Sequence, residues 1–334
     1  MSFRQLARAA ILLALTTFFS SESLRAATSA QPAASNSSAT APTAALQFSP
    51  PDHAKLPVPS FKVQRHDNLV YLDQPADAKR QALDLCRPVG VKDAPVLLFV
   101  HGGGWVFGNR DQVAYHQLCD ALAARGVVTA SVGYRLTPAV KHPAHVEDVA
   151  AAVAWVHRHA ADYGGRPDRI FLTGHSAGGH LVALVATDPK FLAAHQMKPA
   201  DLAGVFPLSG VYSLVEKSED VPPELKLLRA AFGDDPAVIK DASPIKHVTA
   251  GLPPFRLAVG QGEVPLMKAQ TRDFCAALAS AGVDARWTAV PDRGHIQMVE
   301  SFGKDDDVVT VMLLDFVRQR TAALDTVKSP VHAK

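Results

Sequence analysis

The chain has 334 residues, of which 48% are hydrophobic and 20% are charged, so it is able to bury a sizeable core. Its formal net charge is only +2 and it contains no basic run suited to nucleic acid, which argues against a polyanionic partner. Cys86, Cys119 and Cys275 each lie in an apolar segment, and we expect buried free thiols instead of a disulfide framework.

The amino terminus shows the order of regions found in secretory signals. Two arginines come first, an apolar run follows at 9–19, and small residues stand at Ala26 and Ala27. The apolar run is too short to span a hydrocarbon core, which takes about 20 residues. We therefore expect residues 1–27 to be a cleaved signal peptide of a secreted or periplasmic protein, without stable membrane insertion.

The rest of the chain divides into three parts. Residues 28–47 are rich in Ala, Ser, Thr and Pro and lack apolar periodicity, which is typical of a flexible linker. Residues 48–325 have the composition of one α/β domain, and 326–334 form a C-terminal tail. Within the domain, the irregular, proline-containing stretch 212–248 is expected to be a small insertion over the functional site.

Apolar runs with strand character alternate with helical patterns along this domain. Strands are expected at 81–86, 96–100, 127–132, from Ile170 to the turn at 174–178, 202–208, 255–259 and 284–290. Helices are expected at 115–125, from Pro143 onward, at 181–186, between Met267 and Gly282, and from the acidic run 305–307 onward. This alternation predicts a mostly parallel central sheet covered by helices on both faces.

The sharpest signal is Gly174-His-Ser-Ala-Gly178, which stands between an apolar strand and an apolar helix. The glycines allow a turn so tight that side chains at their positions would collide with neighbouring backbone. Strand, Gly-x-Ser-x-Gly and helix together predict a nucleophile elbow, which presents the Ser176 hydroxyl at the carboxyl end of the sheet.

A serine hydroxyl is a weak nucleophile at neutral pH and needs a base, which in turn needs an orienting carboxylate. His295 lies in the loop after the last expected strand, where its imidazole is able to reach the serine. Glu263 is the one carboxylate of the stretch 259–265 after the preceding strand, and we predict that it orients His295. Asp292 is the rival acid, with a solvated turn residue as the alternative interpretation.

A second glycine-rich stretch, His101-Gly-Gly-Gly-Trp105, follows directly after a buried strand. Without Cβ atoms, such a loop lets a substrate approach main-chain N–H groups closely. We therefore assign the predicted oxyanion hole to the N–H groups of Gly103 and Gly104, together with that of Ala177, the residue after the nucleophile.

Other residues near these motifs have structural expectations. His101 is expected to hold the glycine loop through hydrogen bonds. Trp105 and Phe107 are candidates for the wall of an acyl or aryl pocket, with core packing as the alternative. Glu147 and Asp148 are interpreted as a helix-start charge and a loop anchor.

We expect neither a metal nor a cofactor. The chain contains 14 histidines, but no pair has the His-Glu-x-x-His spacing. No phosphate-cradling loop or dinucleotide fingerprint follows any of the expected strands.

Together, the motifs at 101–105 and 174–179 resemble those of the α/β-hydrolase superfamily, in its esterase and lipase branch with hormone-sensitive-lipase-like loops. The stretch 259–265 and the helix after it look more like arylformamidases and bacterial feruloyl or acetyl esterases. The resemblance extends from about Leu69 to Val317. It implies the fold, Ser176 as nucleophile with Glu263 and His295 as partners, and no cofactor. Many relatives carry Asp where this chain has Glu263.

Three functional hypotheses follow. The leading one is a serine carboxylesterase that acts on small acyl or aryl esters through an acyl-enzyme, with the ester as its small-molecule partner. The alternative is an arylformamidase-type amidase, similar to kynurenine formamidase, with the same machinery. A binding module without chemistry is the third, and the presence of all the catalytic parts argues against it.

Overall fold

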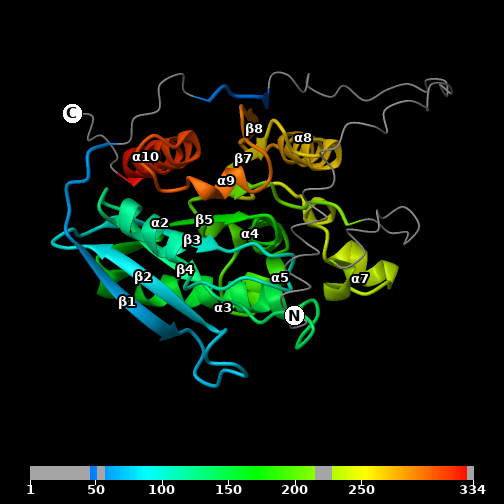
Figure 1. Ribbon diagram of the computed structural model, residues 1–334, viewed down its shortest axis with the longest axis horizontal. Helices are drawn as coiled ribbons and strands as arrows, with labels where there is room; N and C mark the ends of the chain where they lie inside the picture. Colours follow the sequence, from blue (N-terminus) through cyan, green and yellow to red (C-terminus); the bar gives the residue numbers. More distant parts are fainter. Residues whose placement is uncertain (1–45, 51–56, 215–227, 329–334) are drawn as a thin grey trace, which may run out of the picture.

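The computed structural model describes residues 46–50, 57–214 and 228–328, so the predicted signal peptide and most of the linker lie outside the described residues. An eight-stranded sheet runs through the domain in the order β1-β2-β4-β3-β5-β6-β7-β8 (Figure 1). The strands are β1 (Val63–Val70), β2 (Ala82–Pro88), β3 (Ala94–Val100), β4 (Val128–Val132), β5 (Gly165–His175), β6 (Gly204–Leu208), β7 (Phe255–Gly260) and β8 (Ala285–Val290).

Most of this sheet is parallel, as expected. β1 pairs antiparallel with β2, and β2 pairs antiparallel with β4. Every other neighbouring pair, from β4 and β3 across to β7 and β8, is parallel. The carboxyl ends of the parallel strands therefore meet at one edge of the sheet, where ligand sites of such folds are found.

Helices cover both faces. The longer ones are α2 (Val113–Ala123), α3 (Ala144–His159), α4 (Ala177–Thr187), α8 (Pro265–Ser280) and α10 (Val308–Lys328), and the short ones α5 (Pro189–Ala193), α7 (Pro236–Asp241) and α9 (Gln297–Glu300). In Figure 1, α9 and α10 lie on one side of the sheet and α3 on the other. Within the described ranges, no helix is both long enough and apolar enough to cross a bilayer.

The alternation of strand side chains divides the core into two layers. On β3, Leu97 and Phe99 belong to the layer that contains α2 and α10. Leu98 and Val100 belong to the opposite layer, with α3, α4 and α8. Because both faces of β3 are buried, apolar side chains occupy successive positions, and its sequence is a continuous apolar run.

The structure shows three features near the ends of the domain that the sequence analysis does not include. β1 was not expected, because its residues are polar and mostly exposed and show no apolar alternation. Gln47, the last residue of the predicted linker, forms an isolated bridge with Trp287 of β8. At the other end, α10 continues to Lys328, three residues into the predicted tail; residues 329–334 lie outside the described residues.

The predicted insertion 212–248 is described only in part, because residues 215–227 lie outside the described ranges. Its described portion contains α7 and two short 3-10 helices, at 228–231 and 244–247. Tyr212 stacks on Phe274 of α8, and Phe232 packs against Trp105. The described portion is therefore packed onto the domain beside the glycine loop.

All three cysteines are buried and free, as the sequence indicates. Cys86 of β2 and Cys119 of α2 share a small apolar cluster with Ala123. Burial raises the pKa of the Cys275 thiol to about 12, so this thiol stays protonated at neutral pH.

We predict that Gly178→Ala destabilises the fold far more than Gly90→Ala. A Cβ at Gly178 would lie 2.0 Å from the Val100 carbonyl oxygen, a clash that only backbone movement relieves, and we expect a cost above about 3 kcal/mol. Gly90 also has a positive φ, of 81°, but its Cβ would meet nothing within 4 Å, so only conformational strain of about 1–2 kcal/mol is expected. Urea unfolding of both variants measures the difference, and equal losses would contradict the clash.

Candidate active site

The serine predicted as nucleophile sits at the sharpest turn of the sheet edge. Ser176 joins β5 to α4 with φ 56° and ψ −118°, outside the conformations that ordinary residues prefer. Its N–H donates to the carbonyl oxygen of Leu208, 2.9 Å away at the end of β6. The elbow expected from the Gly-x-Ser-x-Gly motif is therefore present, and the serine opens the first turn of α4.

The structure brings Ser176, His295 and Glu263 into one chain of hydrogen bonds. Nε2 of His295 lies 2.9 Å from Oγ of Ser176, and Nδ1 of the same ring lies 2.7 Å from Oε2 of Glu263. A carboxylate only accepts, so Nδ1 carries the proton and Nε2 is free to accept from the serine hydroxyl. The side chains come from loops after three different strands, β5, β7 and β8.

Glu263 is held by its own loop. It is 6% exposed, and its Oε1 accepts from the N–H of Val264 at 3.3 Å. The rival acid, Asp292, is exposed on the loop before His295, and no hydrogen bond among the described residues joins it to that imidazole. The geometry therefore favours Glu263 over Asp292 as the partner of His295.

The acid and base loops pack directly on each other through backbone. The N–H of Gly262 donates to the carbonyl oxygen of Arg293 at 2.9 Å. A Cβ at Gly260 would lie 2.4 Å from that same carbonyl oxygen. The Arg293 side chain donates to Asp307, 3.1 Å away, which caps α10 by accepting from the N–H of Thr310 at 2.9 Å. The acidic run expected to start the last helix therefore also anchors the base loop.

The glycine loop lies against the serine. A Cβ at Gly102 would come within 3.2 Å of the Ser176 Cβ. Gly103 and Gly104 both have positive φ, of 117° and 59°. Among the hydrogen bonds of the described residues, none uses the backbone N–H of Gly103, Gly104 or Ala177 as donor. The assignment of these three N–H groups to an oxyanion hole stays a prediction.

His101 holds this loop, as expected. Its ring stacks on Tyr134 with centroids 4.4 Å apart, and Nδ1 donates to the Gly102 carbonyl oxygen at 2.8 Å. Tyr134 in turn donates its hydroxyl to the His101 carbonyl oxygen at 3.0 Å. A Cβ at Gly108 would lie 2.3 Å from the His101 Nδ1, so the loop folds back tightly over the imidazole.

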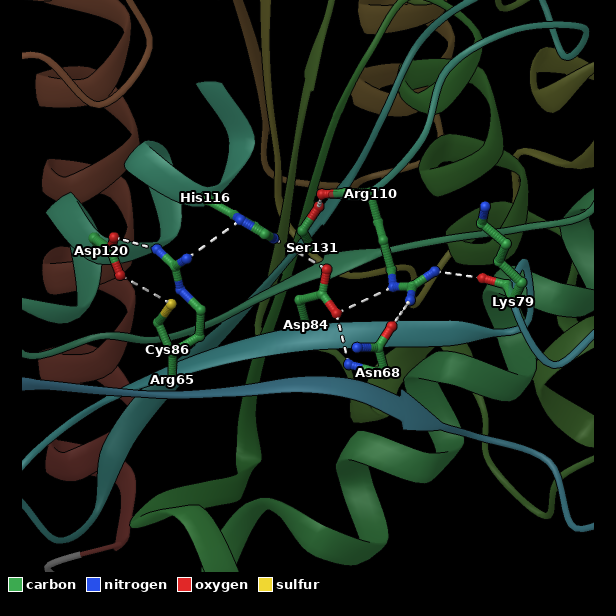
Figure 2. Close-up of polar contacts among 9 residues, drawn as sticks. All are labelled: Arg65, Asn68, Lys79, Asp84, Cys86, Arg110, His116, Asp120 and Ser131. Atoms are coloured by element: carbon green, nitrogen blue, oxygen red, sulfur yellow. Dashed lines mark hydrogen bonds and ion pairs between the residues drawn. The ribbon is translucent and has the colours of Figure 1, made fainter. Parts of the chain in front are cut away.

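The segment that follows the glycine loop is anchored by a buried arginine, Arg110 (Figure 2). Nε of Arg110 donates to Asp84 at 3.1 Å, one of its terminal nitrogens donates to the Asn68 side chain at 2.7 Å, and the other donates to the Lys79 carbonyl oxygen. The Arg110 carbonyl oxygen accepts from Ser131 on β4. The chain on both sides of Gly102–Gly104 is thus held, by His101 before them and by Arg110 after them.

Trp105 is packed in the core instead of standing open to solvent. It is 2% exposed, and its Nε1 donates to Nδ1 of His180 at 3.2 Å. Phe232 lies edge-on to its ring. This arrangement matches core packing, the alternative considered for Trp105. Phe107 is half-buried, and a pocket role for the two aromatic residues stays a prediction.

Three buried histidines around the site are held in the neutral form. Burial lowers the pKa of His101 to about 4. Burial, with the nearby His295, lowers the pKa of His175 to about 3, and burial lowers the pKa of His180 to about 3. Each ring donates to a backbone carbonyl: His101 to Gly102, His175 to His295 and His180 to Ala242.

The roles of His175 and His180 could not be predicted from the sequence, where they appear only as two of many histidines. Each acts on a carbonyl that is distant in the chain, and no local spacing indicates such a partner. By contrast, Asp148 is the loop anchor expected of it, since its carboxylate accepts from the Arg135 backbone N–H and guanidinium and from Gln81. Glu147 lies in the first turn of α3, also as expected.

Among the described residues, two clusters away from the serine have the ligand types of a metal site. In the first, the Asp84 carboxylate accepts from His116 and from the Arg110 guanidinium, as Figure 2 shows. In the second, Lys190 pairs with both Asp188 and Asp241. In each case a basic side chain already supplies the positive charge, so neither donor set fits a cation well.

The chain resembles known esterases in both sequence and structure. Residues 83–278 match the family described as BD-FAE. Two Mycobacterium tuberculosis proteins are similar in sequence. Esterase LipQ is 36% identical over 60% of this chain, and esterase LipC is 35% identical over 68% of it. The matches span only 50% and 58% of those relatives.

Two further comparisons extend over more of the partner protein. Kynurenine formamidase of Danio rerio is 28% identical over 72% of this chain and 79% of its own length. The crystal structure of esterase B from Lactobacillus rhamnosis superposes with a TM-score of 0.67 at 23% identity, over 86% of this chain and 91% of that one. At this identity, the structural match establishes the α/β-hydrolase fold.

We predict that acid destabilises the folded protein over the range in which free histidines titrate. The pKa values of His101, His175 and His180 are about 4, 3 and 3 in the folded state, against 6.5 for an ordinary histidine. The unfolded chain therefore binds more protons than the folded protein. The contribution of these histidines to the free energy of unfolding is fully present above about pH 6.5. It falls as the pH drops toward 3, by up to ~1.4 kcal/mol per pH unit for each histidine.

Urea unfolding at pH 7.5 and pH 5 measures this loss. His101→Gln should reduce the difference between the two pH values. An unfolding free energy that is equal at both pH values would contradict the prediction.

Proposed function

The chain belongs to the BD-FAE family of the α/β-hydrolase fold, and we propose that it is a serine carboxylesterase acting on small acyl or aryl esters. The observation that carries the proposal is the hydrogen-bonded chain Ser176–His295–Glu263, at 2.9 and 2.7 Å. The names of its relatives support the same reaction class.

In the proposed acylation, Oγ of Ser176 attacks the ester carbonyl carbon while Nε2 of His295 takes its proton. Glu263 keeps the other ring N–H in place and stabilises the imidazolium that forms. The carbonyl oxygen becomes an oxyanion, which accepts from the N–H groups of Gly103, Gly104 and Ala177. When the intermediate collapses, the C–O bond breaks, and the leaving alkoxide takes the proton from His295.

Deacylation reverses these roles. His295 removes a proton from a water molecule, which attacks the acyl carbon, and the second intermediate again places its oxyanion in the glycine loop. Ser176 leaves with the proton held by His295, and the carboxylic acid is released. Every step uses protein groups and water alone.

We also propose that the protein acts outside the cytoplasm. The support is the sequence pattern of residues 1–27, where two arginines, an apolar run and small residues follow in the order of a secretory signal.

The triad is tested by three variants. Ser176→Ala should lower kcat for a short aryl ester by about 10⁴–10⁶-fold and abolish labelling by a fluorophosphonate. Glu263→Gln should lower kcat by about 10⁴-fold, because an amide in place of the carboxylate favours the wrong imidazole tautomer. Asp292→Asn is the matched control and should stay near the parental rate. Intact-mass analysis with peptide mapping locates the adduct, and an Asp292 variant as impaired as the Glu263 variant would reverse the assignment of the acid.

A second candidate, an arylformamidase-type amidase, is supported by the kynurenine formamidase match, which covers most of both chains. The same triad would attack a formamide carbonyl, and the leaving group would be an arylamine. The two activities differ in the leaving group. An arylamine must be protonated before it departs, whereas the aryloxide of an aryl ester leaves readily.

We expect phenyl acetate to be hydrolysed with a higher kcat/KM than N-formylaniline. Initial rates of both substrates, with Ser176→Ala as the blank, decide between the candidates. A higher kcat/KM for the formamide would make the amidase the better assignment.

A further inference from the structure

The last side chain of β5 lies between two loops of the site. His175 is only 4% exposed, and its ring centroid is 4.7 Å from that of His295. Its Nε2 lies 2.8 Å from the backbone carbonyl oxygen of His295. A carbonyl oxygen only accepts, so the Nε2 of His175 must carry the proton and donate.

The hydrogen bond from His175 fixes the backbone carbonyl of His295, which no other described residue contacts by a hydrogen bond. The neighbouring carbonyls on the base loop are engaged by the turn into α9: Gly294 accepts from Met298, and Ile296 accepts from Val299. Among the described residues, the His295 carbonyl accepts a hydrogen bond from His175 alone. The peptide bond nearest the base is therefore fixed by a side chain and not by a helix.

On its other side, His175 packs against the glycine loop. A Cβ at Gly102 would lie 3.2 Å from Nδ1 of His175 and 2.9 Å from its carbonyl oxygen. His175 also precedes Ser176 directly in the chain. One residue thus touches the glycine loop, is bonded to the nucleophile and holds the backbone of the base.

We propose that His175 is a positioning residue: its N–H donates to the His295 carbonyl and keeps the base imidazole aligned on the Ser176 hydroxyl. This inference rests on the proposed serine hydrolysis. Rotation of the 294–296 backbone would carry Nε2 of His295 away from Oγ of Ser176, and a misplacement of about 1 Å can cost on the order of 100-fold in rate. Because His175 stays neutral, it adds no positive charge beside the imidazolium that forms during acylation.

Two substitutions separate the hydrogen bond from mere packing. His175→Leu keeps much of the volume but removes the donor. His175→Gln keeps a donating N–H at a similar reach. His145→Leu is the matched control, because His145 is equally buried and has a lowered pKa but bonds to Thr137. For each folded variant, kcat, KM and the rate constant of fluorophosphonate labelling are measured.

We expect kcat and the labelling rate to fall together in His175→Leu, by about 100-fold, with KM little changed. His175→Gln should recover most of this loss, and His145→Leu should keep the parental kcat even if it unfolds more easily. Labelling of His175→Leu at the parental rate would overturn the inference, as would a Gln variant impaired as strongly as the Leu variant.

A measurement on the parent protein covers the case in which His175→Leu does not fold. In ¹⁵N-histidine NMR spectra, assigned by the signals lost in His175→Gln, His175 should be a neutral Nε2–H tautomer that does not titrate between pH 5 and 8. An Nδ1–H tautomer, or titration in that range, overturns the inference. A parent protein that shows this tautomer but neither hydrolyses esters nor takes the label would instead refute the proposed function.

Discussion

The close backbone approach between the elbow and the end of β3 is the constraint on which the site depends. A Cβ on Gly178 would lie 2.0 Å from the Val100 carbonyl oxygen, and one on Gly174 would lie 2.9 Å from the same atom. Val100 is the last residue of β3 and leads directly into His101 and the glycine loop. The contact that allows the serine turn therefore also places the proposed oxyanion donors beside the serine. Because the contact is backbone to backbone, only glycine satisfies it.

Glu263 and His295 lie near Ser176 because parallel strands end at a common edge of the sheet. β7 and β8 are neighbours, and the loops that follow them bring Glu263 and His295 together. β6 contributes no side chain to the proposed triad, but its terminal carbonyl, that of Leu208, accepts the N–H of Ser176. The three side chains of the proposed triad therefore follow directly after strands of one sheet.

Buried neutral imidazoles connect these loops. His101 lies under the glycine loop, His175 joins the elbow to the base loop, and His180 links Trp105 to Ala242 of the insertion. In a low-dielectric interior such hydrogen bonds are strong, but a charged ring would be costly there. The arrangement of the site and the predicted sensitivity to acid therefore have the same physical origin.

The sequence by itself determined the alternation of strands and helices, the elbow at Ser176 and the residues now found beside it. Those features are carried by local patterns: apolar periodicity, glycine at a forced turn, and polar residues placed just after strands. β1 was not predicted, because this exposed edge strand has no apolar alternation. The hydrogen bond from His295 to Glu263, the burial of Trp105 and the bond from His175 to the His295 carbonyl are visible only in the tertiary structure. They join residues far apart in the chain, and which side chain meets which carbonyl depends on the order of the strands and the packing of the loops.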